Sequence, residues 1–186
     1  MSTPTTAPTL TGTWTADPVH SDVSFKVRHM AVGKARGAFT LVGGTLAFTG
    51  EDLATGTVTA AIDATSVDTN NEQRDQHVLS PDFLDAANFA TIDFVSTGVR
   101  EADGDEFVLD GELTIRGTTK PVELEVEYLG VTVDAYGAER LGFSAKTSIS
   151  RKDYGVSFSA AFGAGNSVVA DKVEIDLELE FVKDTV

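Results

Sequence analysis

Three histidines are the residues of this chain that titrate near neutral pH, so they are the first candidates for a metal or acid–base site. His20 and His29 are nine positions apart, and on one unbroken strand an odd separation places two side chains on opposite faces. Neither a His-x-His pair nor a His-Glu-x-x-His helix occurs. The spacing argues against a histidine metal site, so no metal is expected.

The positions of His29 and His77 still allow other roles. His29 follows the spacing of the apolar residues before it, so we expect its imidazole to face inward. Two interpretations stay open for it: a buried ring satisfied by a hydrogen bond, or a ligand contact. His77 falls in a helical stretch, where an exposed surface position and a place over a cavity are the alternatives.

Nucleophilic catalysis has no motif in the chain. Cysteine is absent, and neither Gly-x-Ser-x-Gly nor Ser-x-x-Lys occurs. The 29 Asp and Glu residues fall mostly on the solvent-facing positions of predicted strands, so no carboxylate pair stands out as catalytic. The reactive residue types therefore do not point to an enzyme. The predicted strands and helix say more about the fold and about where these residues lie.

Alternation with a period of two dominates the chain and predicts β-strands with one apolar face. The clearest run is 173–181, where apolar and acidic residues alternate. Gly117 predicts the turn of a hairpin between the runs at 107–115 and 122–128. About eight antiparallel strands of about ten residues predict a closed barrel or a sandwich, and their length favours a deep barrel.

One segment departs from this alternation. Thr69-Asn70-Asn71-Glu72 has the pattern of a capping box, with Thr69 as the N-cap. It predicts a helix from Asn70 to Leu79, and Ser80-Pro81-Asp82 then predicts a second helix start. We expect this helical insertion to lie across one end of the barrel.

The overall composition is that of a globular chain with one domain. The 186 residues carry 14 Lys and Arg against 29 Asp and Glu, a net charge of −15, and 41% are hydrophobic. This acidic balance opposes binding to nucleic-acid phosphates and anionic lipid head groups. No run approaches the 18 or so apolar residues of a membrane span. We therefore expect neither nucleic acid nor stable membrane insertion.

The N-terminal end predicts a flexible Thr/Pro-rich tail over residues 1–11, followed by a single domain over 12–186. The tail has no Lys or Arg and no apolar stretch, so it does not resemble a secretory signal. We therefore expect a cytoplasmic protein.

The interior of an eight-stranded barrel can be filled with side chains or can hold a ligand. Small residues at three inward positions, Ala60, Gly111 and Ala145, favour a partly hollow interior. The residue pattern alone therefore predicts a β-barrel that binds an apolar small molecule, with a filled core as the alternative.

Several motifs, taken together, resemble one known family. They are Asp17-Pro18-Val19-His20-Ser21 with Val23-x-Phe25-x-Val27-x-His29-Met30, Arg74-Asp75-x-His77-x-Leu79-x-x-Asp82-Phe83-x-Asp85 with Ile92-x-Phe94, Gly111-x-Leu113-Thr114-Ile115-Arg116-Gly117-x-Thr119-Lys120-Pro121-Val122, Arg151-Lys152-Asp153-Tyr154-Gly155 and Asp171-x-Val173-x-Ile175. They are similar to the motifs of the YceI-like family of polyisoprenoid-binding proteins and extend from about Gly12 to Phe181. The resemblance implies an all-β fold, an extended eight-stranded antiparallel lipocalin-like barrel with a short helical insertion.

The resemblance also implies a ligand, because proteins of this family hold an isoprenoid lipid such as a quinone tail in a long apolar pore. In this chain the implied ligand-binding lining is Phe25, Val27, Phe94, Leu113, Phe143 and Phe158. The motif positions His29, His77 and Arg151 join this set, either to orient a head group, to anchor the helix or to fix a turn.

Two classes of function follow. The first is binding, storage or transport of an isoprenoid lipid, a polyprenyl chain or a quinone tail, without chemistry. The second is an enzyme that acts on an apolar substrate inside the barrel, with His29 as general base. We favour the first because no second catalytic partner can be named, and we expect no cofactor besides the bound lipid. The resemblance also implies a homodimer, which salt should strengthen by screening the repulsion between acidic copies.

Overall fold

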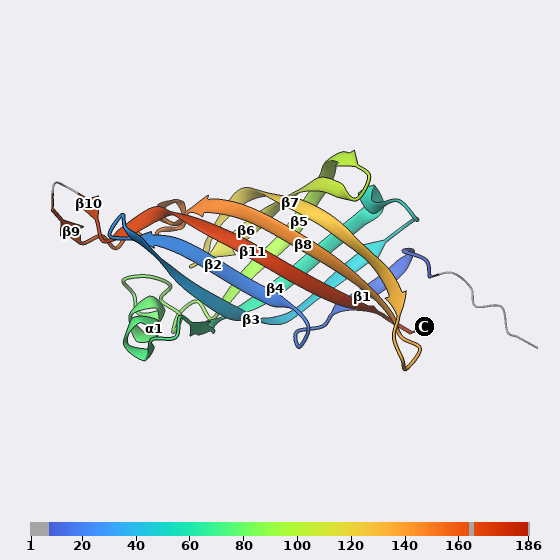
Figure 1. The fold of residues 1–186 in the computed structure, drawn as a ribbon, viewed down its shortest axis with the longest axis horizontal. Helices are drawn as coiled ribbons and strands as arrows, with labels where there is room; N and C mark the ends of the chain where they lie inside the picture. The colour runs from blue at the N-terminus through green and yellow to red at the C-terminus, as the bar shows by residue number, and fades with distance from the viewer. Residues whose placement is uncertain (1–7, 164–165, 186) are drawn as a thin grey trace, which may run out of the picture.

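The structure, a computed structural model, describes residues 8–163 and 166–185, so residues 1–7 of the predicted tail lie outside the described residues. Long strands wrap into an elongated barrel (Figure 1). Its strands are β1 (Gly12–Ala16), β2 (Asp22–His29), β3 (Gly33–Phe48), β4 (Gly56–Asp68), β5 (Thr91–Asp103), β6 (Glu106–Ile115), β7 (Thr118–Val133), β8 (Glu139–Ser150) and β11 (Val169–Lys183). Two short strands, β9 (Ala161–Phe162) and β10 (Asn166–Ser167), form a separate hairpin.

The barrel closes through an antiparallel pairing between β8 and β11. β1 and β2 each pair with β11 on one side and with β3 on the other, so they share one place in the sheet. Counted in this way, the order around the barrel is β1/β2, β3, β4, β5, β6, β7, β8 and β11. The predicted barrel of eight antiparallel strands is confirmed.

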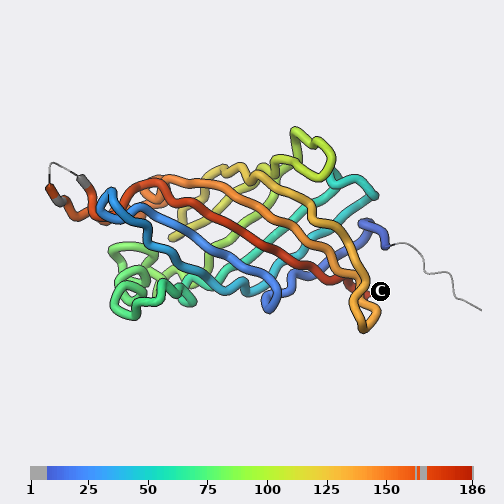
Figure 2. Tube along the Cα trace, in the orientation of Figure 1, coloured from blue at the N-terminus to red at the C-terminus, as the bar shows by residue number. Residues whose placement is uncertain are grey.

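The strands cross the barrel at a tilt (Figure 2). β3 and β7 each contain 16 residues and β11 contains 15, which exceeds the predicted length of about ten. At about 3.3 Å per residue, a strand of this length extends over roughly 50 Å. The strands are therefore long enough to enclose a deep interior.

The hairpin between β6 and β7 turns at Arg116 and Gly117, whose φ angles are 49° and 71°. Two consecutive positive φ angles are typical of a tight hairpin turn, and glycine adopts them without a steric penalty. A Cβ atom on Gly117 would also lie 2.7 Å from the ring of Phe89. The turn predicted at Gly117 is confirmed.

The predicted helix is α1 (Glu72–Leu79), and its N-cap is Asn71. The Asn71 side chain accepts a hydrogen bond from the backbone N–H of Arg74 at 2.9 Å. Thr69 instead donates both its backbone N–H and its hydroxyl to the carboxylate of Asp75. The prediction of a capping box at Thr69 was therefore wrong, because Asp75 binds that hydroxyl and the helix begins two residues later than expected.

A second helix start at Ser80-Pro81-Asp82 was also wrong, because a series of turns follows α1. The hydroxyl of Ser80 donates to the carbonyl of His77 at 2.7 Å, and the N–H groups of Phe83 and Asp85 both donate to the carbonyl of Ser80. The insertion lies at one end of the barrel, as expected (Figure 1). None of the helices in the described ranges is long and apolar enough to cross a bilayer.

The opposite end of the barrel is packed. Trp14 and Leu141 are 0% and 1% exposed, and Phe48 and Phe181 belong to the same buried cluster. The indole N–H of Trp14 donates to the carbonyl of Leu10 at 2.8 Å. These contacts close the barrel at the end away from α1.

Candidate functional site

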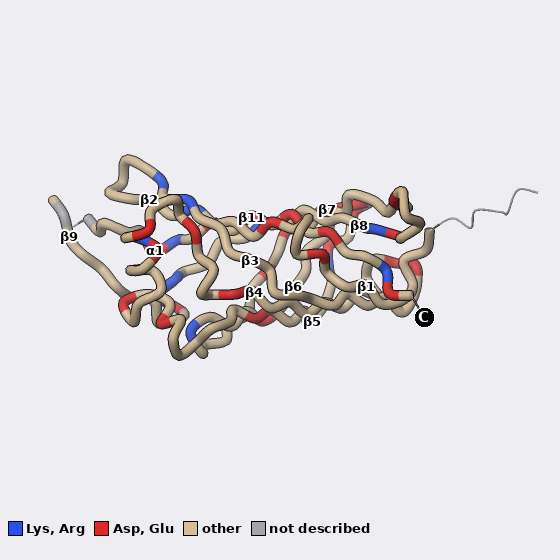
Figure 3. Tube along the Cα trace, turned by 90° about the horizontal axis from the view of Figure 1, so that it is seen from below, with Lys and Arg blue, Asp and Glu red and all other residues tan. Residues whose placement is uncertain are grey.

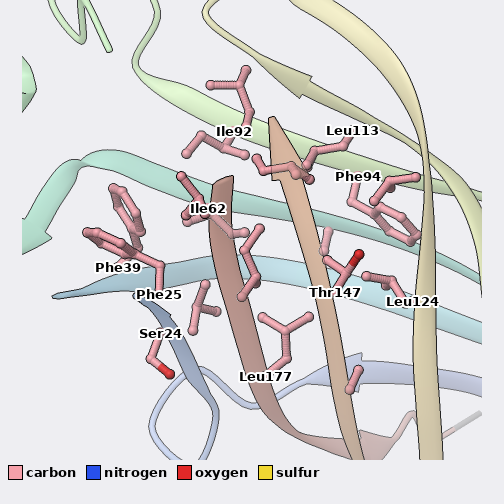
Figure 4. A pocket seen from close by; sticks show the side chains of 18 of the residues that line it. Ser24, Phe25, Phe39, Ile62, Ile92, Phe94, Leu113, Leu124, Thr147 and Leu177 are labelled. Carbon is pink, nitrogen blue, oxygen red and sulfur yellow. The ribbon is translucent and has the colours of Figure 1, made fainter. Parts of the chain in front are cut away.

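An apolar tunnel of about 570 Å³ occupies the barrel interior. Its lining extends from Phe48 and Phe181 near the closed end to His29 and Val169 near α1. Figure 4 shows side chains from several strands around this space, among them Ile62, Leu113 and Leu177. The volume lies in the range of small-molecule sites, and an apolar wall selects an apolar ligand.

The alternation of β11 builds one wall of the tunnel. Val173, Ile175 and Leu177 line the tunnel, whereas Glu174 and Asp176 form ion pairs with lysines of β2 and β3. The lining residues Val169 and Phe181 are twelve positions apart, which corresponds to about 40 Å of strand. The tunnel therefore follows most of the barrel length.

Two glycines make room for aromatic rings in the wall. A Cβ atom on Gly111 would lie 2.4 Å from the ring of Phe94, and one on Gly37 would lie 2.6 Å from the ring of Phe25. The prediction that Gly111 opens the interior was wrong, because the ring of Phe94 fills the space that the missing side chain leaves. Ala60 and Ala145, in contrast, do line the tunnel.

The tunnel opens at the α1 end, where lining residues become exposed to solvent. These residues are Arg28 and His29 at the end of β2, and Arg74 and His77 on α1. His29 thus faces the tunnel at its rim. Of the two interpretations left open for His29, the structure excludes the buried ring, because β2 ends at this rim and the residue is exposed to solvent.

An aromatic cluster at the mouth joins α1 to the segment 156–160. The ring centroid of His77 lies 4.9 Å from those of both Phe83 and Phe158, in edge-on geometry. Phe83 and Phe158 are themselves 5.1 Å apart. Nε2 of His77 lies 2.9 Å from the carboxylate of Asp82. His77 combines the two alternatives, because its side chain is 43% accessible and also lines the tunnel at the mouth.

Arg151 is a buried guanidinium between the mouth and the start of β11. Its three nitrogens donate to backbone carbonyls: Nε to Ala170 at 2.9 Å, and the two terminal nitrogens to Val156 at 2.7 Å and Val169 at 3.1 Å. Burial lowers the pKa of Arg151 from its ordinary value. Of the roles left open for this residue, its contacts are those of fixing a turn.

The insertion is attached to the barrel by two further arginines. Arg74 donates from Nε to the hydroxyl of Thr69 at 2.8 Å and from a terminal nitrogen to its carbonyl at 2.7 Å. Arg116, in the β6–β7 turn, donates to the carbonyl of Phe83 at 2.8 Å. These bonds hold α1 and the turns after it against the mouth.

Comparison with known proteins identifies the fold family. The model of the YceI-like domain matches residues 14–181. The chain belongs to the YceI-like family. Protein YceI from Escherichia coli O157:H7 is 39% identical over 137 residues, which cover 74% of this chain and 71% of that protein. A UPF0312 protein from Vibrio cholerae is 30% identical over 164 residues, which cover 88% of this chain and 82% of that protein.

Solved structures share the YceI-like barrel. BcnA from Burkholderia cenocepacia aligns with a TM-score of 0.74 and 25% identity, over 89% of this chain and 98% of BcnA. A polyisoprenoid-binding domain from Saccharophagus degradans aligns with a TM-score of 0.66 and 16% identity, over 92% of this chain and 98% of that domain. The latter likeness is one of fold. The resemblance drawn from the sequence motifs is confirmed.

All nine residues predicted to bind a ligand line the tunnel of this YceI-like barrel. They are Phe25, Val27, His29, His77, Phe94, Leu113, Phe143, Arg151 and Phe158. Their contact with a ligand stays a prediction. The six apolar members come from strands and from the segment 156–160, and the three polar members all lie toward the mouth.

Sequence reasoning missed several polar residues of the YceI-like tunnel, among them Arg74 and Thr147. Arg74 lies three positions before His77 on α1, and this spacing puts both on one helix face. Thr147 shares the inward positions of Phe143 and Ala145 on β8, and Figure 4 shows it among the lining residues. Helical spacing and strand alternation were therefore signals that could have found them.

Among the residues that the structure describes, one cluster of possible metal ligands lies outside the tunnel of the YceI-like barrel. Ligand atoms of Asp17, His20 and Glu180 lie within 4.8 Å of one another. Arg140 donates to Asp17 at 2.9 Å and also to Glu180. The guanidinium already supplies a positive charge to both carboxylates, so the cluster is explained as an ion-pair network.

Proposed function

We propose that this protein binds a long isoprenoid lipid, a polyprenyl chain or a quinone tail, and carries or stores it without chemical change. The observation that carries this proposal is the tunnel: it is lined almost wholly by apolar side chains, follows most of the barrel length and opens at one end. An extended hydrocarbon fits such a space.

The energetics of burial favour a long apolar ligand. Each CH₂ group moved from water into an apolar site contributes about 0.8 kcal/mol. A polar group placed between Ile62, Leu113 and Leu177 would lose its hydrogen bonds to water without replacement, at a cost of several kcal/mol. Affinity should therefore increase with chain length until the tunnel is full.

Two comparisons with known proteins support the proposal independently of the tunnel's shape. The chain belongs to the YceI-like family, and the domain from Saccharophagus degradans that shares its fold is described as polyisoprenoid-binding. That description belongs to the other protein. Together with the apolar lining of this tunnel, it favours an isoprenoid over other hydrocarbons.

The enzyme alternative gains little from the positions of the histidines. His29 is exposed at the rim, and the His77–Asp82 pair is exposed at the mouth, with side chains 43% and 56% accessible. A general base for an apolar substrate would have to reach the reacting atom inside the tunnel. We therefore assign His77 to the aromatic contacts that hold α1 over the mouth.

The test is native mass spectrometry of freshly purified protein, followed by organic extraction of any bound molecule. A titration of lipid-free protein with prenyl alcohols of increasing chain length accompanies it. We expect a co-purified isoprenoid, affinity that increases with chain length, and recovery of the lipid unchanged. Affinity independent of chain length would refute the tunnel as a site for a prenyl chain, and a product lost in His29→Ala would favour the enzyme.

A further inference from the structure

The charges of the β2–β3 region have the opposite sign to those of the molecule as a whole. Residues 23–50 contain no Asp or Glu, in a chain that has 29 of them. The run carries four cationic side chains, Lys26, Arg28, Lys34 and Arg36. All four lie on the two strands that meet at the β2–β3 turn.

The strand register places these cations opposite one another. Lys26 pairs with Arg36, and Arg28 pairs with Lys34. Like charges directly opposite on neighbouring strands destabilise a sheet, so the arrangement concentrates positive charge at a cost. Asp176 and Glu174 of β11 bind the two lysines at 2.6 Å and 3.2 Å. Among the described residues, neither arginine of this hairpin has a carboxylate within 4.0 Å, and both are exposed.

The tip of the hairpin is apolar and exposed. Val32 is 93% exposed and Met30 is 39% exposed. Met30 and Ala31 have φ angles of 52° and 59°, a region that Gly, Asn and Asp adopt at lower cost in such turns. The tip therefore presents apolar side chains to water, and two of them, Met30 and Ala31, stand where Gly, Asn or Asp would fit the backbone better.

This tip adjoins the mouth of the tunnel. His29 lines the tunnel and directly precedes Met30, and the lining residue Ala35 lies just beyond the turn. In Figure 3, Lys and Arg segments lie at the end of the molecule that carries α1 and the β2 label, with Asp and Glu segments at the same end. The apolar tip, the four cationic side chains of the β2–β3 hairpin and the tunnel opening thus lie at the same end.

We propose that the β2–β3 hairpin docks the barrel, mouth first, on an anionic phospholipid surface. Val32 and Met30 enter the boundary between head groups and acyl chains, and Arg28 and Arg36 contact lipid phosphates. The repulsion from the net charge of −15 is screened beyond a Debye length of about 8 Å at physiological salt, so the cations of the β2–β3 hairpin, which lie at the contact, determine its electrostatics. The support for this docking surface comes from the hairpin alone. Its purpose, exchange of a lipid between tunnel and bilayer, rests on the proposed function.

The experiment is co-sedimentation of the full chain with vesicles of phosphatidylglycerol and phosphatidylcholine, compared with vesicles of phosphatidylcholine alone. We expect binding to the anionic vesicles that weakens as salt increases. Lys34→Gln/Arg36→Gln should reduce the partition coefficient roughly 30-fold, because each cation near an anionic surface contributes a factor of about five. Neither residue lines the tunnel.

Matched controls separate the hairpin from general charge and hydrophobicity. Lys120→Gln/Lys146→Gln removes the same charge from exposed positions on β7 and β8 and should leave partition within about twofold. Val32→Ser should weaken binding about tenfold, whereas Val19→Ser, at a valine of the β1–β2 turn that is 85% exposed, should not. Equal loss in both double variants, equal binding to neutral vesicles, or no vesicle binding by the native chain would overturn the proposal.

Prenyl alcohol titration without vesicles keeps the two proposals distinguishable. Lys34→Gln/Arg36→Gln should bind the prenyl chain as the native protein does, since its side chains lie outside the tunnel. Vesicle binding without prenyl binding would refute the lipid carrier and leave the docking surface. Prenyl binding without vesicle binding would refute the docking surface and leave the carrier.

Discussion

Arg151 shows how a residue that lines a ligand site can serve the fold. Its guanidinium spans from the carbonyl of Val156 to those of Val169 and Ala170, and it lies 6.0 Å from the ring centroid of Phe83. A buried charge is tolerated only when its donors are satisfied. Because its donors are directed to backbone carbonyls, Arg151 positions the wall of the mouth.

Replacement of Arg151 should therefore affect stability first. We expect Arg151→Met to lower the free energy of unfolding by about 3 kcal/mol, since one buried and two partly buried carbonyl groups lose a charged donor. Arg151→Lys should fall between this variant and the native chain. Urea unfolding measures both. If Arg151→Met instead has native stability and an altered head-group preference, Arg151 binds the ligand and does not fix the fold.

The carboxylate of Asp17 should make the stability of the fold depend on pH, with lower stability in acid. The hydrogen bond with His20, with a smaller contribution from Arg140, lowers the pKa of Asp17 from 3.8 to about 2. A carboxylate with a lowered folded-state pKa stabilises the fold above its unfolded pKa, and this contribution disappears as the pH falls from about 4 to 2. Asp17→Asn should cost about 1–2 kcal/mol at pH 5 and almost nothing at pH 2. Thermal unfolding at the two pH values tests this, and a penalty independent of pH would exclude the charge as its cause.

The sequence predicted correctly which side chains face the barrel interior, but it did not predict how far from the mouth each one lies. Strand alternation correctly placed Phe25, Phe94 and His29 toward the interior, because the period of two is a local property. It could not show that His29 lies at the rim, since the position of a strand end along the barrel depends on pairing with distant strands.

At the scale of elements, the sequence predicted where strands lie along the chain, but it did not predict how all of them pair in the sheet. A half-buried strand shows its alternation in the sequence, so the runs at 107–115, 122–128 and 173–181 were expected as strands, and they lie within β6, β7 and β11. The sharing of one sheet position by β1 and β2 depends on their pairing with β3 and β11, which is long-range. The hollow interior was similarly ambiguous, because a filled and an empty barrel show the same alternation.

The tunnel can be tested by placing bulk on one strand. Ala145 of β8 is 5% exposed, lines the tunnel and pairs with Leu177 and Val126. Ala145→Phe should displace several CH₂ groups of a long prenyl chain, which corresponds to about 2–3 kcal/mol or a roughly 30- to 150-fold loss of affinity. Short chains should lose less. Fluorescence titration with short and long prenyl alcohols measures the difference.

Ser148→Phe is the matched control for this variant. Ser148 lies on the same strand, three positions later, and is exposed on the outer face. It should bind both chains as the native protein does. Equal affinity of Ala145→Phe for all chain lengths would place the ligand outside the tunnel.

At the scale of the whole molecule, two kinds of association compete for the mouth. The hairpin tip is apolar and adjoins the tunnel, so either a bilayer or a second copy of the chain could cover it. The charges separate these cases. A bilayer with anionic lipids attracts the cations of the β2–β3 hairpin, whereas a second copy brings another charge of −15.

The predicted homodimer should therefore strengthen as salt increases. Repulsion between two acidic copies extends over about 30 Å at ~0.01 M salt and about 8 Å at ~0.15 M, while apolar contacts at the interface persist. Light scattering of the protein at tens of micromolar, at low and high salt, measures the association. A monomer under both conditions would contradict the dimer. Vesicle docking should weaken over the same change in salt, because screening removes its attraction. Opposite salt dependences would therefore assign each association to its own force, apolar burial for the dimer and charge for the membrane.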